Sequence, residues 1–325
     1  MTKAMRIHEY GGPEVLRWED VALAAPGAGE ALVRHTAVGL NFVDVYMRNG
    51  LYPQPALPGA IGFEAAGVVE AIGEGVADIG VGDRVAYAAP PPGAYAENRL
   101  IPAAVLVKIP DGVEDEQAAA MMLKGMTAEY LLHRTYAVRP GDAILFHAAA
   151  GGVGLIACQW AKQLGATVIG TVSTAEKAAC AAAHGCDHPI ILGEGGFAEQ
   201  VRELTGGKGV QVVYDSVGKD SFEGSLASLA PRGMMVSFGQ SSGPVPDFNI
   251  ELEAFGSLFL TRPGLWAYTA SRGELEASAN ALFEVVAAGH VRIEINQTYA
   301  LADAVQAHTD LEARKTTGST VLLPG

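Results

Sequence analysis

The feature that most constrains the fold of this 325-residue chain is a glycine-rich turn between an apolar strand and a helix. Apolar residues 143–147 lead into the turn, AAAGGVG at 148–154, and a helical pattern follows over 155–164. The N–H groups that open such a helix can bind an anion, because they have no acceptor within the helix and the helix dipole attracts negative charge. Glycine is needed because a Cβ would keep a pyrophosphate at a distance. The segment therefore predicts a dinucleotide site.

The turn departs from the usual dinucleotide fingerprint at one position. The fingerprint reads G-x-G-x-x-G, whereas this chain has Ala149 first, followed by Gly151 and Gly154. A tight turn between a strand and a helix also collects glycines for structural reasons alone. Strands alternate with helical segments downstream, which is typical of βαβ units. This context favours a cofactor site over a purely structural turn.

The end of the next strand predicts the choice of cofactor. Enzymes that prefer NAD usually carry Asp or Glu there to bind the ribose hydroxyls, whereas this chain has Ser173, and Lys177 follows at the start of a helix. The Lys177 ammonium could meet the 2′-phosphate of NADPH; the alternative is a solvated surface lysine beside Glu176. S-adenosylmethionine enzymes share the glycine turn but also usually carry an acid at this point. The segment favours NADPH.

The length of the chain allows two domains, which invite a cleft between them. Short apolar runs alternate with glycine and proline in the first third, which predicts a compact, mostly antiparallel β domain over 1–124. The middle third predicts a Rossmann domain with a doubly wound parallel sheet over 125–264, and residues 265–325 are expected to complete the first domain. The strands expected in the parallel sheet are 143–147, 167–172, 210–215 and 234–238.

Charge and cysteine content exclude several classes of protein. A formal net charge of −14 argues against nucleic acid as the main partner, because such binding depends on Lys and Arg neutralising phosphates. Three cysteines give no secreted disulfide framework, and the N-terminus lacks the apolar stretch of a signal peptide. Residues 143–160 are apolar, but His147 and three glycines interrupt them, so no membrane span is expected. We expect a soluble protein of the cytoplasm.

The cysteine pattern also argues against a zinc enzyme. Zinc alcohol dehydrogenases need an early cysteine ligand, a histidine and a second thiolate. No cysteine precedes Cys158, and Cys180 and Cys186 do not have the spacing of zinc ligands. Without a Lewis acid to polarise an alcohol, we expect an acceptor that is already electron-poor enough to take a hydride.

Six stretches of the chain together match a known family. They are GLNFVDVY at 39–46, GFEAAGVV at 62–69, VGDRV at 81–85, LKGMTA at 123–128, the turn at 148–154 and VYDSVG at 213–218. Over essentially its whole length the chain resembles the zinc-free, zeta-crystallin-like quinone oxidoreductases of the medium-chain dehydrogenase/reductase superfamily, in their bacterial branch. Asn41 and Phe63 stand where zinc-bearing relatives place a Cys and a His, in keeping with the zinc-free branch.

The resemblance implies a GroES-like first domain, a Rossmann domain, NADPH bound across the cleft and a homodimer. Residue by residue, it implies cofactor contacts from Asn41, Phe42, Val43, Asp44, Val45, Tyr46, Thr127, Tyr130, Gly151, Gly152, Val153, Gly154, Ser173, Lys177, Ser216, Phe238, Gly239, Gln240, Ser241, Arg262, Pro263, Gly264 and Arg314. One position departs from the family. Its bacterial members commonly have a tyrosine near the 2′-phosphate where this chain has Leu192, which leaves Lys177 as the main determinant of NADPH preference.

The expected reaction is direct reduction of a quinone or a similar conjugated carbonyl compound by NADPH, without flavin. Asn41, Tyr46 and Tyr52 are expected to position this acceptor, and none of them needs to be an obligatory acid or base. Two alternatives stay open: reduction of the C=C bond of an enone or alkenal, and a non-catalytic role as an NADPH-binding crystallin or RNA-binding protein. The physiological acceptor and the choice between one- and two-electron transfer also stay open.

Overall fold

The computed structural model describes residues 1–193, 196–245 and 256–325, which form two compact units. Unit 1 contains residues 1–126, 269–287 and 293–325, and unit 2 contains residues 127–268 and 288–292. The chain changes unit after residues 126 and 268, whereas the sequence suggested changes after 124 and 264. The short segment 288–292 belongs to unit 2, although it follows a helix of unit 1.

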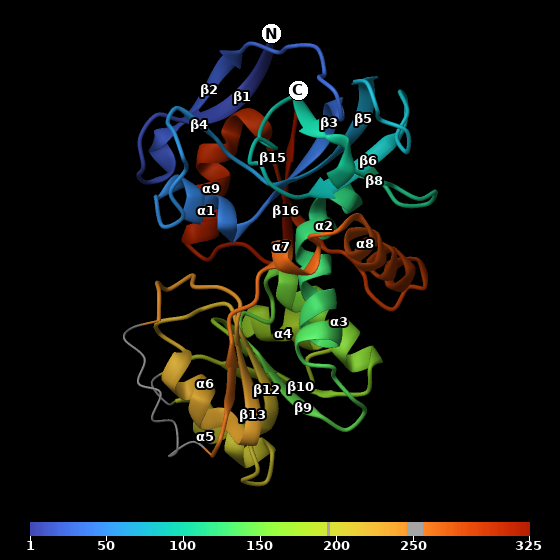
Figure 1. The fold of residues 1–325 in the computed structure, drawn as a ribbon. Helices are drawn as coiled ribbons and strands as arrows, with labels where there is room; N and C mark the ends of the chain where they lie inside the picture. The colour runs from blue at the N-terminus through green and yellow to red at the C-terminus, as the bar shows by residue number, and fades with distance from the viewer. Residues whose placement is uncertain (194–195, 246–255) are drawn as a thin grey trace. The chain divides into compact units, whose positions relative to one another are not determined.

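Unit 1 is built on β-sheets that are mainly antiparallel (Figure 1). In the larger sheet the order is β15 (Ile295–Ala300), β16 (Ser319–Leu323), β3 (Glu30–Leu40), β5 (Glu64–Ile72), β6 (Arg84–Ala88) and β8 (Val107–Lys108), and β7 (Asn98–Pro102) also pairs with β3. The smaller sheet contains β2 (Leu16–Val21), β1 (Thr2–Ile7) and β4 (Gly59–Ala60). In strand β3 the first positions alternate between buried and more exposed, as in a half-buried strand, whereas the last four are all buried.

Four helices accompany these sheets within unit 1. They are α1 (Phe42–Arg48), α2 (Asp115–Glu129, up to residue 126), α8 (Arg272–Ala287) and α9 (Ala304–Glu312). Helix α1 begins directly after β3, with Asn41 as its N-cap, Asp44 in its first turn and Arg48 in its last, which suits the helix dipole at both ends. Gly125 lets α2 approach α8, because a Cβ on it would lie 2.4 Å from a methyl group of Leu282.

Unit 2 is a parallel sheet with helices between its strands (Figure 1). The strand order is β11 (His188–Ile191), β10 (Thr167–Val172), β9 (Ala143–Phe146), β12 (Val210–Asp215), β13 (Leu229–Ser237) and β14 (Phe259–Thr261). The connecting helices include α3 (Gly152–Gln163), α4 (Ala175–Ala183), α5 (Phe197–Leu204) and α6 (Phe222–Ser228). The order reverses between β9 and β12, which is the switch point of a doubly wound sheet. The predicted fold class, a doubly wound parallel sheet with a mostly antiparallel β domain, is confirmed.

The sequence missed several elements of unit 2, among them β11, β14 and α5. Strand β11 contains a proline and β14 is only three residues long, so neither gives a clear strand pattern. Helix α5 is short, although Phe197 and Val201 bury one face of it in the core. Strand β13 begins at Leu229 rather than at 234, because Pro231 and Arg232 interrupt its apolar pattern. Within the described ranges, no helix is both long and apolar enough to cross a bilayer.

Candidate nucleotide and acceptor sites

Most candidate cofactor residues of unit 2 follow the carboxyl ends of neighbouring parallel strands. Gly151–Gly154 follow β9, Ser173 follows β10, Ser216 follows β12, Phe238–Ser241 follow β13 and Arg262–Gly264 follow β14. Because the carboxyl ends of parallel strands lie along one edge of a sheet, the structure brings these segments together at that edge. The switch point between β9 and β12 lies among them, and this is where α/β sheets bind their ligands.

The glycine turn is fixed by close backbone contacts. Gly151 caps α3, and a Cβ on Gly154 would lie 2.4 Å from the carbonyl oxygen of Ala148, too close for any side chain. Ala149, which replaces the first glycine of the fingerprint, fits because the facing residue on β10 is Gly170, whose Cβ would lie 2.6 Å from that of Ala149. The N–H groups of Gly152, Val153 and Gly154 form the first turn of α3, where an α-helix offers them no acceptor. The turn therefore presents donors suited to a pyrophosphate.

A buried polar network lies behind this edge of the sheet. His147 contacts the Thr171 hydroxyl through Nδ1 at 2.8 Å and the Ser225 hydroxyl through Nε2 at 2.9 Å. Asp215 Oδ2 accepts hydrogen bonds from Ser225 and Ser221, each at 2.7 Å. Burial lowers the pKa of His147, and the Asp215 carboxylate opposes that shift. A neutral imidazole suits the geometry, because its N–H donates to Ser225 while its other nitrogen accepts from Thr171.

Asp215 also holds the loop that contains Ser216. Its Oδ1 accepts the N–H groups of Val217 at 2.8 Å and Gly218 at 3.0 Å. The carbonyl of Ser216 in turn accepts the N–H of Ser241 at 3.1 Å, which ties the loop after β12 to the loop after β13. The sequence singled out the motif around Asp215 but assigned the aspartate no role, because nothing local shows that it is buried.

The start of α4 holds the candidate 2′-phosphate residues. Ser173 is exposed, Thr174 is the N-cap, and its hydroxyl accepts the N–H of Lys177 at 3.2 Å. The Lys177 side chain is half-buried in the first turn of the helix. Directly after the adjacent strand β11, the N–H of Leu192 donates to the carbonyl of Val172 at 2.8 Å, and its apolar side chain is exposed. Lys177 is thus the cationic residue at this helix start.

Tyr130 lies in a cluster of aromatic rings and arginines within unit 2. Its ring stacks on that of Tyr268 at 4.5 Å, and the Arg134 guanidinium lies 5.2 Å from the Tyr268 ring. Burial raises the pKa of the Tyr130 hydroxyl, Tyr268 adds to the rise, and the nearby Arg262 cation opposes it. Arg262 also donates to the Ser237 hydroxyl at 3.2 Å. The structure thus brings Tyr130 and Arg262 together, and the sequence missed Tyr268.

The remaining candidate cofactor residues lie outside the loops at the carboxyl edge of the sheet. Thr127 is buried near the C-terminal end of α2, at the beginning of unit 2. Arg314 is exposed in unit 1, two residues after α9, in a left-handed conformation with a φ of 57°. Asn41 to Tyr46, like Tyr52, also belong to unit 1.

The acceptor candidates of unit 1 lie around α1. The rings of Tyr46 and Tyr52 meet edge to face at 5.3 Å, and the N–H of Tyr52 donates to the carbonyl of Tyr46 at 2.9 Å. Phe42 adds a third ring, 5.6 Å from that of Tyr46. Tyr46 is buried, whereas Tyr52 is 37% exposed. The Tyr46 ring therefore backs the Tyr52 ring, which is the exposed member of the pair.

Two buried acids hold Asn41. Its backbone N–H donates to Asp44 Oδ2 at 2.9 Å, and its side-chain Nδ2 donates to Glu64 Oε2 at 2.7 Å. The Lys124 ammonium lies 3.1 Å from the same Glu64 oxygen. Asp44 and Glu64 are both fully buried. Apart from the family assignment of Asp44, the sequence gave these charges no role.

Asp44 is the end of a second buried chain of polar groups. The Tyr95 hydroxyl donates to Asp44 Oδ2 at 3.1 Å and lies 3.0 Å from His308 Nε2, while His308 Nδ1 lies 3.1 Å from Arg48 Nη1. Asp44 Oδ1 is buried and has no hydrogen-bond partner among the described residues. Burial raises the pKa of Asp44 to about 7, although its bond to the Asn41 N–H and the Tyr95 hydroxyl oppose the rise. Burial likewise lowers the pKa of His308 to about 3.

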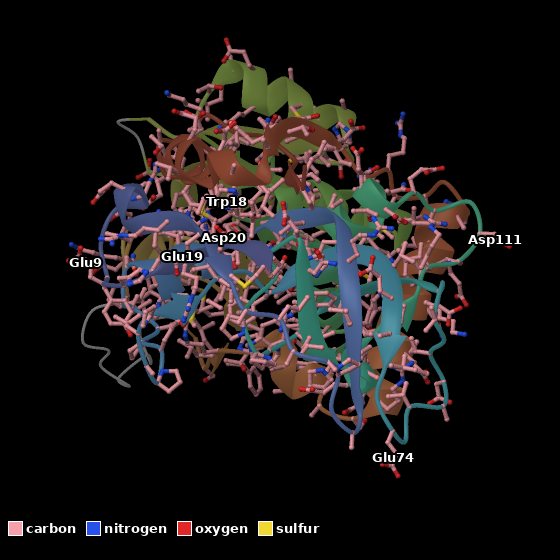
Figure 2. All side chains as sticks on the ribbon, turned by 90° about the horizontal axis from the view of Figure 1, so that it is seen from above. Glu9, Trp18, Glu19, Asp20, Glu74 and Asp111 are labelled. Carbon is pink, nitrogen blue, oxygen red and sulfur yellow. The ribbon has the colours of Figure 1, made fainter. Side chains whose placement is uncertain are left out.

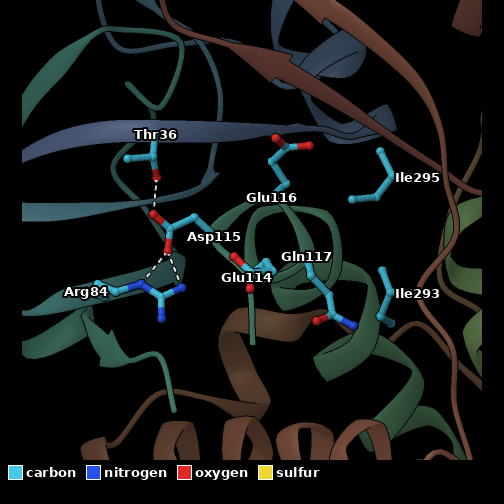
Figure 3. Close-up of a pocket in the computed structure, with 8 residues that line it drawn as sticks. All are labelled: Thr36, Arg84, Glu114, Asp115, Glu116, Gln117, Ile293 and Ile295. Carbon is cyan, nitrogen blue, oxygen red and sulfur yellow. Dashed lines mark hydrogen bonds and ion pairs between the residues drawn. The ribbon is translucent and has the colours of Figure 1, made fainter. Parts of the chain in front are cut away.

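A separate open hollow of about 590 Å³ lies in unit 1 at the start of α2 (Figure 3). Asp115 there accepts hydrogen bonds from Thr36 at 2.7 Å and from the Arg84 guanidinium. No candidate site residue lines this hollow. In the parts of the chain that the structure describes, no group of three or more His, Cys, Asp and Glu side chains is placed to hold a metal ion.

Comparison with known proteins gives consistent matches along the chain. The family model for an alcohol dehydrogenase GroES-like domain matches residues 27–111, and that for a zinc-binding dehydrogenase matches residues 152–281. A quinone oxidoreductase of Pseudomonas aeruginosa is 55% identical, with both chains covered completely. A 2-haloacrylate reductase of Burkholderia sp is 49% identical over 100% of this chain and 99% of its own. The crystal structure of Escherichia coli quinone oxidoreductase complexed with NADPH is 49% identical, covers 99% of this chain and 100% of its own, and has a TM-score of 0.97.

We expect Asp44→Asn to alter how stability depends on pH. The folded-state pKa of about 7 lies above the ordinary 3.8, so the protonated carboxyl favours the fold. This contribution to the free energy of unfolding is fully present below pH 4. It decreases by about 1.4 kcal/mol per pH unit as the pH rises from 4 to 7. The amide of the variant does not titrate. The free energy of unfolding of Asp44→Asn minus that of the wild type should therefore rise from pH 4 to 7.

Urea denaturation of both proteins across this range measures the difference. The matched control is Asp111→Asn, since Asp111 is exposed at the surface. The difference in the free energy of unfolding between Asp111→Asn and the wild type should not change with pH. If the difference for Asp44→Asn does not change with pH either, the buried carboxyl does not titrate in this range.

Proposed function

Because the chain belongs to the zinc-free quinone oxidoreductase family of the medium-chain dehydrogenases/reductases, we propose that it uses NADPH to reduce quinones or similar conjugated carbonyl compounds. The observation that carries the proposal is the row of dinucleotide-type turns along the carboxyl edge of the parallel sheet. The solved relative complexed with NADPH, which is similar over the full length, supports the same cofactor here.

The residues of unit 2 fit the parts of NADPH. The first N–H groups of α3 suit the pyrophosphate, and Gly154 keeps the turn open to it. Ser173 and the Lys177 ammonium suit the 2′-phosphate, since a cation and a helix N-terminus both favour an anion. The network around Asp215 holds the loop of Ser216 in place. When bound, NADPH supplies the hydride; the protein binds, orients and excludes water.

The acceptor residues need not transfer a proton. Tyr46 and Tyr52 offer aromatic faces to a planar molecule, and Asn41 offers an amide to its carbonyl group. A quinone gains aromaticity on reduction, and its product can take a proton from water. The absence of early cysteine ligands, with Asn41 and Phe63 at the positions of zinc ligands in relatives, argues for chemistry without zinc.

A second enzymatic function has specific support. The 2-haloacrylate reductase is 49% identical to this chain, and the reduction of a C=C bond conjugated to a carbonyl uses the same hydride. The RNA-binding alternative is disfavoured by the formal charge of −14. Acidic side chains of unit 1, among them Glu9, Glu74 and Asp111, project into solvent in Figure 2 and would repel a phosphate backbone.

A homodimer in the cytoplasm is part of the same proposal. Strand β14 pairs with β13 on one side, and no strand of the described residues pairs with its other side. Phe259 and Leu260 on β14 are 59% and 42% exposed. An apolar, unpaired strand edge is an aggregation hazard unless something covers it, and a second copy of this chain would do so.

We expect Lys177→Ala to weaken NADPH binding by roughly 10- to 150-fold, because a hydrogen bond to a charged group contributes about 1.5–3 kcal/mol. NADH lacks the 2′-phosphate, so its binding should hardly change. Fluorescence titration with both cofactors measures the two affinities. Lys208→Ala removes an exposed lysine of the same unit and serves as the control. Equal losses for NADPH and NADH in Lys177→Ala would limit this lysine to a role in folding.

The role of Tyr52 as a surface rather than a proton donor can be tested with two variants. Tyr52→Phe keeps the ring that meets Tyr46, so kcat should stay within about tenfold, a barrier change of about 1.4 kcal/mol or less. Tyr52→Ala removes the ring and should raise KM for bulky planar quinones more than for small ones. Steady-state kinetics with one small and one bulky quinone give both numbers. A collapse of kcat in Tyr52→Phe with KM unchanged would identify Tyr52 as a proton donor.

A further inference from the structure

Glu64 is a fully buried carboxylate with a complete set of hydrogen-bond donors. Its Oε1 accepts the N–H of Leu123 at 2.7 Å, and its Oε2 accepts from Asn41 Nδ2 at 2.7 Å and Lys124 Nζ at 3.1 Å. The site has room for this group because the residue opposite Glu64 on β3 is Gly39, whose Cβ would lie 2.3 Å from Oε2. The cluster is thus built from β3, β5 and α2 within unit 1.

The Glu64 side chain determines which end of the Asn41 amide faces it. A carboxylate only accepts hydrogen bonds, so the nitrogen of the Asn41 side chain, rather than its oxygen, must face Glu64. Lys124, only 5% exposed, supplies the opposite charge that a buried carboxylate requires. The Asn41 backbone is held independently by Asp44. Side chain and backbone of Asn41 are therefore both fixed by buried acids.

We propose that Glu64 and Lys124 are positioning residues that fix the Asn41 amide, so that its second N–H, and not its oxygen, is available to the carbonyl oxygen of the acceptor. The inference rests on the proposed function and adds to it how the acceptor is recognised. Nδ2 carries two hydrogens, and one of them is used by Glu64. A carbonyl oxygen gains negative charge as the acceptor is reduced, so a donor stabilises the transition state, whereas an amide oxygen would repel it.

The first test separates positioning from structural support. Glu64→Gln leaves a side chain that both donates and accepts, so position 64 no longer requires the nitrogen of Asn41 to face it, and kcat should fall about 10- to 100-fold. Lys124→Met should have a similar effect by removing the counter-charge of Glu64. The double variant Glu64→Gln/Lys124→Met leaves no unpaired buried charge, so it should regain much of the thermal stability that the single variants lose. Its kcat should nevertheless stay low.

The matched control is Glu70→Gln on the same strand. Glu70 pairs with Arg34 at 2.9 Å, but both side chains of that pair are largely exposed, so kcat should not change. A double variant that folds stably and keeps the wild-type kcat would show that Glu64 and Lys124 do not position the Asn41 amide, and would overturn the proposal. NADPH affinity, followed by fluorescence, should remain close to that of the wild type in every variant.

Asn41→Asp provides a second test should the double variant not fold. It places a carboxyl against Glu64, and two carboxyls in contact bind a proton more readily than one alone. When protonated, the introduced carboxyl has a single hydrogen, and once this is donated to Glu64 none is left for the acceptor. The ratio of the kcat of the variant to that of the wild type should therefore stay low from pH 8 to pH 6. The charged groups that face position 41 are Asp44, Glu64 and Lys124, and Tyr95 with His308 face Asp44.

The use of a ratio removes the contribution of groups that both proteins share, Asp44 included. A ratio that rises close to one at low pH would show that the acceptor needs no second N–H at position 41, and would contradict the proposal. If neither quinones nor enones support NADPH oxidation by the wild-type protein, the proposed function itself is refuted. The two failures are therefore distinguishable.

Discussion

The contact between the glycine turn and its neighbours is the constraint on which the nucleotide site depends. A Cβ on Gly154 has no room beside the carbonyl of Ala148, and Ala149 is tolerated only because Gly170 faces it from β10. These contacts set α3 directly on the end of β9, with its first N–H groups at the carboxyl edge of the sheet. The other loops reach the same edge because all their strands are parallel, and Asp215 ties the loop of Ser216 to the strand before it.

In unit 1, buried charged groups constrain the candidate acceptor site, as the glycine contacts constrain the nucleotide site in unit 2. Asn41 and Phe63 stand where zinc-bearing relatives have metal ligands, and the fold surrounds Asn41 with Asp44, Glu64 and Lys124 instead. Burying these ions is costly, and it is tolerated because each carboxylate accepts hydrogen bonds and Lys124 opposes the charge of Glu64. The role that we propose for this cluster is to fix orientation rather than to add stability. This agrees with a reaction in which the cofactor carries the chemistry and the protein positions the reactants.

The sequence predicted the features that are local in the chain. The strand, turn and helix at 143–164 and the pair Ser173 and Lys177 each lie within one short segment, so spacing alone indicates their roles. The chain from Asp44 through Tyr95 to His308 could not be predicted, because single polar residues far apart in sequence leave no periodic pattern. The stacking partner Tyr268 and the network behind the sheet were missed for the same reason. Strand β11 was missed because a proline and its exposed positions hide the apolar signal.

The most direct measurement is the rate of NADPH oxidation by the purified protein, after treatment with a zinc chelator, across a panel of quinones, enones and 2-haloacrylate. We expect turnover to survive the chelator, to be fastest with quinones and to be much slower with NADH at limiting cofactor. Loss of activity in the chelator with recovery on adding zinc would contradict the metal-free chemistry, and a preference for enones or 2-haloacrylate over every quinone would contradict the assigned acceptor.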